Sequence, residues 1–291
     1  MDADSTAPKL PVELWDEILS FIPDSKTLNA FCLVTKASCE LGRRYLFKKL
    51  TVYNSQLQVF AQFSSTSPHI FTHTRTLCIS EVSEDDPDFF IDVDVLHTAL
   101  SALPRLESFS FAGFALRTRH AMAFEQPVFR NLKHLDIEIE EPGYQLQSDE
   151  HADCPIAVLQ RFLSMFCRVE EFIVRHLWNG KCRCVFDVPE DGPALLGPEY
   201  VLRVLEKHPS PPLDVEKLHL LNLPLCSFPE VLISHALREA PSLRSLVMNV
   251  MSLETSISQE DVLNRLGYCL RSIELGWGCW SDGGESHTAL R

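Results

Sequence analysis

This chain of 291 residues, 45% of them hydrophobic and 23% charged, has the composition of a folded globular protein and not of a disordered one. Asp and Glu number 40 against 26 for Lys and Arg, so the formal net charge of -14 would repel nucleic-acid phosphate, and we expect no nucleic-acid partner. The first residues carry no apolar run and no stretch approaches the roughly 18 apolar residues of a membrane helix, so we expect no membrane contact and a cytoplasmic or nuclear protein.

Residues 10–50 carry the signals of short helices, after a stretch, 1–9, that we expect to be disordered. Pro11 suits an early helical position because its missing N–H would have no partner there. Leu14 and Ile18 then form an apolar stripe at helical spacing. A module this short buries little apolar surface alone, so it would gain stability by resting on a neighbour or a partner.

Two more helices follow a break at residues 23–25. Asp24 or Ser25 can cap the second helix, on which Leu28 continues the apolar spacing. The third helix is predicted to run from about Ser38 to Lys49. The pattern across the whole three-helix module consists of Leu10-Pro11-Val12-Glu13-Leu14, Ile18-Leu19, Leu28, Val34, Lys36, Leu41, Leu46-Phe47 and Leu50.

This pattern resembles the F-box in residue types, spacing and length. The resemblance implies that the exposed parts of the module contact the adaptor of Skp/cullin/F-box ubiquitin ligases. The sequence departs from the family at Ser38, where many F-boxes carry Trp or Phe, and a serine weakens the apolar anchor of the third helix. The alternative is a helical cap that closes the following domain, with its apolar residues as ordinary core. The positions that match adaptor-binding positions are Leu10, Pro11, Leu14, Ile18, Leu28 and Val34.

Downstream of residue 50 a Leu-x-x-Leu-x-Leu spacing recurs. The last two apolar residues of each copy alternate with polar neighbours, which is the period of a strand with one buried face. The gaps between the central residues of successive copies run from 26 to 46 residues, so the shorter ones match a leucine-rich repeat and the longer ones indicate insertions. The copies are Thr74/Leu77/Ile79, Leu106/Phe109/Phe111, Leu132/Leu135/Ile137, Val169/Phe172/Val174, Val215/Leu218/Leu220, Leu243/Leu246/Met248 and Leu270/Ile273/Leu275.

A segment with helical periodicity precedes most of these strands, which favours a parallel sheet with helices on its convex side. The predicted fold class is therefore α/β: a three-helix F-box at 10–50, an irregular leucine-rich-repeat-like solenoid with a curved parallel sheet at 51–280, and a flexible tail at 281–291. The predicted helices are Leu57–Phe63, Val95–Leu103, Ile156–Phe166, Tyr200–Leu205, Val231–Leu237 and Val262–Leu270.

The repeats resemble the leucine-rich repeats that often follow an F-box, except where an Asn normally closes the strand turn. That Asn satisfies backbone carbonyls from copy to copy, so its absence predicts an irregular solenoid and leaves another α/β arrangement open. The residues in its place are Phe114, Leu177, Leu223 and Met251.

Polar residues between the apolar strand positions would point toward the concave face. The residues that bind a target stay unknown, because no transferable target motif exists, and plain solvent exposure is the alternative for each polar side chain. Two insertions, 140–151 and 178–198, are predicted to be surface loops that either contact a target or have no role. The polar residues on the predicted face include Ser110, Asp136, Glu138, His219 and Asn249.

No cofactor and no metal is expected. Ten cysteines lie scattered along the chain without a paired framework, which predicts reduced thiols. Cys182 and Cys184 follow His176, but no second pair with the spacing of a zinc site lies nearby. The sequence also lacks a phosphate loop, a dinucleotide-binding turn and a nucleophile elbow, so an enzyme with a site near 178–198 is an alternative without positive evidence.

The sequence therefore predicts a non-catalytic protein with two parts and separate partners. The resemblance implies that residues 10–50 bind a Skp-family adaptor and, through it, a cullin, while residues 51–280 bind an unidentified protein target. Ubiquitin transfer would then follow from proximity. The alternative is a protein-interaction scaffold built on the repeats that assembles no ligase.

Overall fold

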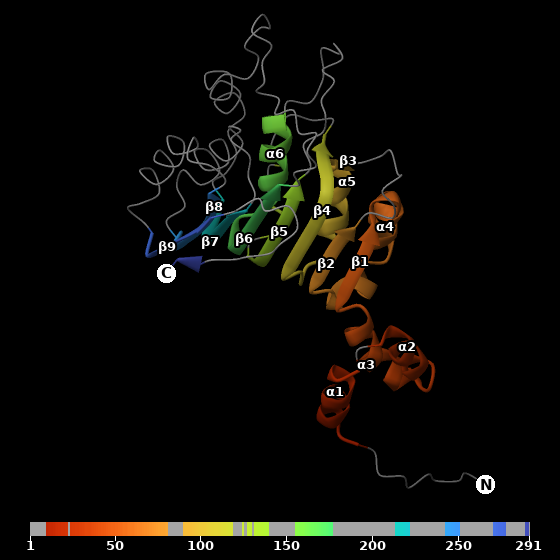
Figure 1. The fold of residues 1–291 in the computed structure, drawn as a ribbon. Coiled ribbons are helices and arrows are strands. Elements are labelled where there is room, and N and C mark those ends of the chain that lie inside the picture. The colour runs from red at the N-terminus through yellow and green to blue at the C-terminus, as the bar shows by residue number, and fades with distance from the viewer. Residues whose placement is uncertain are drawn as a thin grey trace, which may run out of the picture.

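The structure, a computed structural model, contains a small helical module followed by an α/β domain (Figure 1). The predicted α/β class is confirmed, because the domain is built on one mostly parallel sheet. The stretch 1–9 that was predicted to be disordered lies outside the described residues. The structure describes residues 10–22, 24–80, 90–118, 124, 127–129, 131–139, 155–176, 213–221, 242–250, 270–277 and 289–290.

Three short helices form the helical module, residues 10–46: α1 (Val12–Ser20), α2 (Ser25–Cys32) and α3 (Lys36–Leu46). Pro11 is the residue before the first turn of α1, where its extended backbone leads into the helix. Asp24 caps α2, because its carboxylate accepts hydrogen bonds from the backbone N–H groups of residues 26 and 27.

Helix α3 begins two residues before the predicted start, and the reason is a capping box. The hydroxyl of Thr35 accepts a hydrogen bond from the backbone N–H of Ser38 over 3.0 Å, and the hydroxyl of Ser38 accepts one from the backbone N–H of Thr35 over 2.8 Å. Ser38 is buried in the first turn of α3. Ser38 therefore secures the start of α3.

Eight strands run parallel in the sheet order β1-β2-β4-β5-β6-β7-β8-β9. Strand β10 adds to β9 in antiparallel sense, and β3 pairs with the far end of β4. The strands are β1 (Lys49–Tyr53), β2 (Thr76–Ser80), β3 (Phe90–Asp92), β4 (Ser108–Arg117), β5 (Leu132–Ile139), β6 (Arg168–His176), β7 (Asp214–Leu221), β8 (Ser245–Val250), β9 (Ser272–Trp277) and β10 (Ala289–Leu290).

The seven copies of the sequence repeat form seven neighbouring strands, β2 and β4 to β9. Their central residues pair strand by strand, so the predicted repeat is one continuous row across the sheet. The first six residues of the row are completely buried, whereas the last one, in β9, is exposed. The row is Leu77, Phe109, Leu135, Phe172, Leu218, Leu246 and Ile273.

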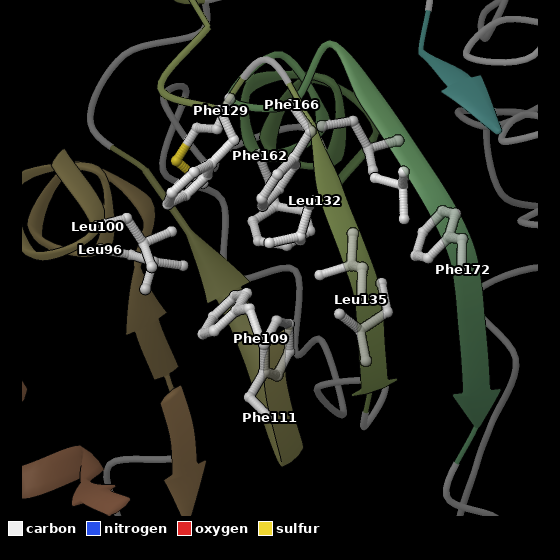
Figure 2. Packing of buried hydrophobic residues seen from close by; sticks show 14 of the residues in the cluster. Leu96, Leu100, Phe109, Phe111, Phe129, Leu132, Leu135, Phe162, Phe166 and Phe172 are labelled. Atoms are coloured by element: carbon white, nitrogen blue, oxygen red, sulfur yellow. The ribbon is translucent and has the colours of Figure 1, made fainter. Parts of the chain in front are cut away.

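The core lies between this row and the helices α4 (Leu57–Thr66), α5 (Val93–Ser101) and α6 (Pro155–Leu163). Figure 2 shows Leu96 and Leu100 of α5 and Phe162 of α6 beside the phenylalanines of β4. The rings of Phe111 and Phe162 meet edge to face with their centroids 5.7 Å apart. One face of the sheet therefore packs against these helices to form the hydrophobic core of the domain.

Two short 3-10 helices, η1 (Asn54–Gln56) and η2 (Pro68–His73), flank α4. The ring of Phe71 in η2 is 3% exposed and forms edge-to-face contacts with Phe60 and Phe63 of α4. This cluster closes the core at the first strand of the sheet, next to the end of α3.

The predicted curvature of the sheet is wrong, since the sheet does not curl (Figure 1). A repeat curves when a helix, about 10 Å wide, stands behind each strand, about 4.8 Å wide. Among the described residues, only α4, α5 and α6 accompany eight parallel strands. Three predicted helices, Tyr200–Leu205, Val231–Leu237 and most of Val262–Leu270, lie outside the described residues.

Strands β1, β3 and β10 were not predicted. Ala289–Leu290, in the segment predicted as a flexible tail, forms β10 and pairs with Gly276 and Leu275 of β9. The remainder of that predicted tail lies outside the described residues. The sheet thus extends beyond the seven repeat copies at both edges.

Candidate functional site

The helical module exposes many large apolar side chains. Phe21, directly after α1, is 78% exposed, and Leu33, directly after α2, is 87% exposed. Seven exposed large apolar residues within the segment 10–34 are typical of a protein-binding surface. We call this set the apolar helical surface; its members are Leu10, Val12, Leu14, Ile18, Phe21, Leu33 and Val34.

Five of the six residues predicted to contact an adaptor are exposed, whereas Leu28 is buried, with 6% of its surface accessible. Leu28 is the buried residue of α2, so in this arrangement it supports the module from inside and offers no contact surface. Sequence reasoning missed Val12, Phe21 and Leu33 as members of the surface. The signal was available, because all three are large apolar residues within the predicted helical module. The five exposed residues are Leu10, Pro11, Leu14, Ile18 and Val34.

An aromatic pair and a hydrogen bond join the three helices of the module. The rings of Trp15 in α1 and Phe31 in α2 lie 5.3 Å apart. The hydroxyl of Tyr45 in α3 donates a hydrogen bond of 2.8 Å to the backbone carbonyl of Asp16 in α1. Burial, with the neighbouring Asp16 carboxylate, raises the pKa of the Tyr45 hydroxyl, so this donor keeps its proton at neutral pH.

Helices α2 and α3 approach closely at Gly42, which is buried. A Cβ atom at this position would lie 2.4 Å from the Sγ atom of Cys32 and 3.2 Å from the ring of Phe31. Burial is also the main reason why the pKa of the Cys32 thiol is raised. A glycine is therefore needed here for the two helices to pack.

The second candidate surface is the face of the sheet opposite the core, which we call the polar sheet face. Its residues alternate with the buried row and are partly accessible to solvent. Four of the five residues predicted to face a target lie on it: Ser110, Asp136, Glu138 and His219. The fifth, Asn249, occupies the β8 position that pairs with Gly276 of β9.

A carboxylate bridges two histidines at the centre of this face. One Glu171 oxygen lies 3.0 Å from Nδ1 of His134 in β5, and the other lies 3.3 Å from Nε2 of His219 in β7. Glu171 in β6 pairs with His134 in register. The arrangement therefore joins three adjacent strands through their side chains.

A second charged group lies next to this bridge. Arg175 of β6 forms an ion pair of 3.1 Å with Asp136 of β5. Glu138, two residues further along β5, lies on the same side of the strand and is partly buried. Burial raises the pKa of the Glu138 carboxyl above its ordinary value, the nearby Asp136 carboxylate raises it further, and Arg175 opposes both effects.

Among the described residues, no group of three or more His, Cys, Asp and Glu side chains is arranged to hold a metal ion. No helix in the same residues is long and apolar enough to cross a membrane. Cys182 and Cys184, and the insertions 140–151 and 178–198, lie outside the described residues. The described residues thus carry two candidate surfaces, the apolar helical surface and the polar sheet face.

No protein-family model matches the chain, and a search of curated proteins finds no match. The F-box resemblance therefore rests on the residue pattern of the module. What the structure adds is the three-helix arrangement and the side chains that this arrangement leaves exposed.

Proposed function

We propose that this protein is the substrate-recognition subunit of a Skp/cullin/F-box ubiquitin ligase, acting in the cytoplasm or the nucleus. The observation that carries the proposal is the apolar helical surface, which lies on the segment whose sequence resembles an F-box. The helical module binds the Skp-family adaptor and reaches the cullin through it. The α/β domain, in this proposal a leucine-rich-repeat-like solenoid, binds a protein target.

Burial of the apolar helical surface would supply the binding free energy for the adaptor. Each large apolar side chain that passes from exposed to fully buried contributes about 1.5–3 kcal/mol, although a few central side chains dominate such interfaces. Leu14 and Ile18 lie one helical turn apart on α1, so they can enter one groove of a partner. Pro11 fixes the direction of the chain at the start of that helix.

The protein itself performs no chemistry in this proposal. Phe47, at the end of α3, packs on Phe71 of the α/β domain, which supports a fixed placement of the target relative to the adaptor. A target held near the ubiquitin-charged enzyme reacts faster because the encounter becomes intramolecular. The polar sheet face is the surface that we assign to the target.

The test is co-expression of the full chain with an adaptor from the same organism, followed by size-exclusion chromatography and pull-down. The Pro11→Asp/Leu14→Asp variant is expected to lose the complex, because it places two charges in an apolar interface. Val59→Asp is the matched control, since Val59 on α4 is 67% exposed and lies outside the module. Adaptor binding that survives in the double variant, or is absent from the wild type, overturns the proposal.

One observation favours a second function, a protein-interaction scaffold without a ligase. Ser38 stands where many F-boxes carry an aromatic side chain, and its hydroxyl is engaged with Thr35. An adaptor that needs the aromatic anchor would then bind weakly. A folded wild-type chain that is indifferent to the adaptor, next to a control F-box that binds it, supports the scaffold.

A further inference from the structure

The carboxylates of the polar sheet face differ in how fully they are already paired. Because the Glu171 carboxylate only accepts, Nδ1 of His134 donates the hydrogen bond of 3.0 Å between them. The other Glu171 oxygen lies 3.3 Å from Nε2 of His219. Both oxygens of Glu171 are therefore already in contact with a neighbouring side chain.

Two carboxylates of β5 are less completely paired. One oxygen of Asp136 takes the ion pair with Arg175, and the other is buried without a hydrogen-bond partner in the described part of the chain. Within the same residues, Glu138 makes no hydrogen bond and no ion pair, although it is partly buried. Partial burial of this carboxylate without a hydrogen bond is unfavourable, and the charge of Arg175 offsets the effect only in part, so a further cationic group placed beside Glu138 would be stabilising.

The net charge of the polar sheet face also favours a cationic partner. At the positions of β5 to β7 that alternate with the buried row, three carboxylates, Asp136, Glu138 and Glu171, stand against two permanent cations, Arg175 and Lys217. The whole chain carries a formal net charge of -14. An acidic peptide or a nucleic acid would be repelled by this excess, whereas a basic segment would be attracted.

We propose that the polar sheet face binds an extended target segment through an arginine or lysine side chain seated at Glu138, beside Asp136. This inference rests on the proposed function, because it names the class of target that the receptor takes. Arginine fits best, since its guanidinium has five N–H donors, no acceptor, and a planar shape that can pair with a carboxylate through two hydrogen bonds.

The probe for the experiment is a display library of random linear peptides, selected on the full-length chain. Selected peptides are expected to be rich in Arg and Lys. Replacement of the key arginine by citrulline, which has the same shape without the charge, should weaken binding about tenfold or more. Glu138→Gln should weaken binding of the arginine peptide to a similar extent.

The matched control is Glu170→Gln, because Glu170 is an exposed carboxylate near the start of β6 that belongs to neither the histidine bridge nor the Arg175 pair. This variant should bind the peptides like the wild type. Selection of acidic or apolar peptides, indifference to citrulline, or unchanged binding by Glu138→Gln would each overturn the inference.

Adaptor capture by the same protein preparations separates this inference from the proposed function. A chain that ignores the adaptor but binds arginine peptides through Glu138 refutes the ligase and retains the basic-segment site. A chain that captures the adaptor but whose selected peptides do not depend on Glu138 refutes the site alone. Thermal unfolding of each variant verifies that the fold is intact.

Discussion

The ring of Phe47, directly after α3, lies 6.3 Å from the ring of Phe71 in η2, and the two rings meet edge to face. Phe71 also packs on Phe60 and Phe63 of α4, so the end of the helical module joins the aromatic core of the α/β domain. Directly after Phe47, the backbone carbonyl of Lys48 accepts hydrogen bonds from the backbone N–H groups of residues 75 and 76. These contacts fix the direction in which the module leaves the domain.

Truncation of the Phe47 side chain should loosen the attachment of the helical module without unfolding the sheet. Phe47→Ala removes an aromatic pair and partly buried apolar surface, so we expect the free energy of unfolding to fall by about 1–3 kcal/mol. Limited proteolysis should then cut faster between α3 and β1. Val59→Ala, on the exposed side of α4, serves as control and should leave both measurements unchanged. Equal proteolysis of Phe47→Ala and wild type would show that the ring contact does not hold the module.

Gly42→Ala tests the close approach of α2 and α3. At an unhindered helical position, alanine is more favourable than glycine by about 1 kcal/mol. Here the new Cβ would lie 2.4 Å from Sγ of Cys32, so we expect destabilisation by about 1–3 kcal/mol in chemical unfolding. The double variant Gly42→Ala/Cys32→Ala should recover part of this loss. A single variant more stable than the wild type would contradict the packing described.

His97 should make stability depend on pH. Its ring stacks on Phe124 with 3.9 Å between centroids, and burial, together with the nearby Arg161 guanidinium, lowers its pKa below the ordinary 6.5. The unfolded chain therefore takes up the proton first, and stability falls as pH drops below 6.5 toward the folded-state pKa. His97→Phe keeps the stack and removes the proton, so its urea midpoint should fall less over this range. Parallel pH curves for the two proteins would contradict this.

Glu138→Gln should have opposite effects on stability and on binding. Because the pKa of Glu138 is raised above 4.5, the unfolded chain loses the proton first, and stability is lost as pH rises from 4.5 through the folded-state pKa. The neutral variant is therefore expected to be more stable than the wild type at neutral pH and to bind arginine peptides less well. Measured unfolding at pH 7 and pH 4 would show the gain disappear on acidification. A loss of stability at neutral pH would be inconsistent with this account.

The repeat spacing was sufficient to predict the sheet, because apolar residues at fixed spacing must all reach the same core. Strand β1 has no such spacing, and among its residues only Val52 is buried, so nothing in the pattern marked it. Strands β3 and β10, with three and two residues, are too short to show any period. Their formation depends on neighbouring strands that are distant in sequence.

The candidate surfaces were predictable in part. The apolar positions of the module were found from the F-box pattern, but which side of a short amphipathic helix is covered depends on its neighbours, and Leu28 proved to be buried. On the sheet, Asp136 in β5 and His219 in β7 were each predicted from the alternation of apolar and polar residues within its own strand. Glu171 and His134 were missed, because their pairing depends on the register between strands, which no single segment contains.

Adaptor capture by matched variants tests the central claim most directly. The full chain, Val59→Asp and Pro11→Asp/Leu14→Asp would each be co-expressed with the adaptor and analysed by size-exclusion chromatography, with thermal unfolding to verify the fold. The ligase account predicts a stable complex with the first two proteins and none with the third. A folded wild-type chain that elutes apart from the adaptor, or a double variant that still binds it, would contradict the account.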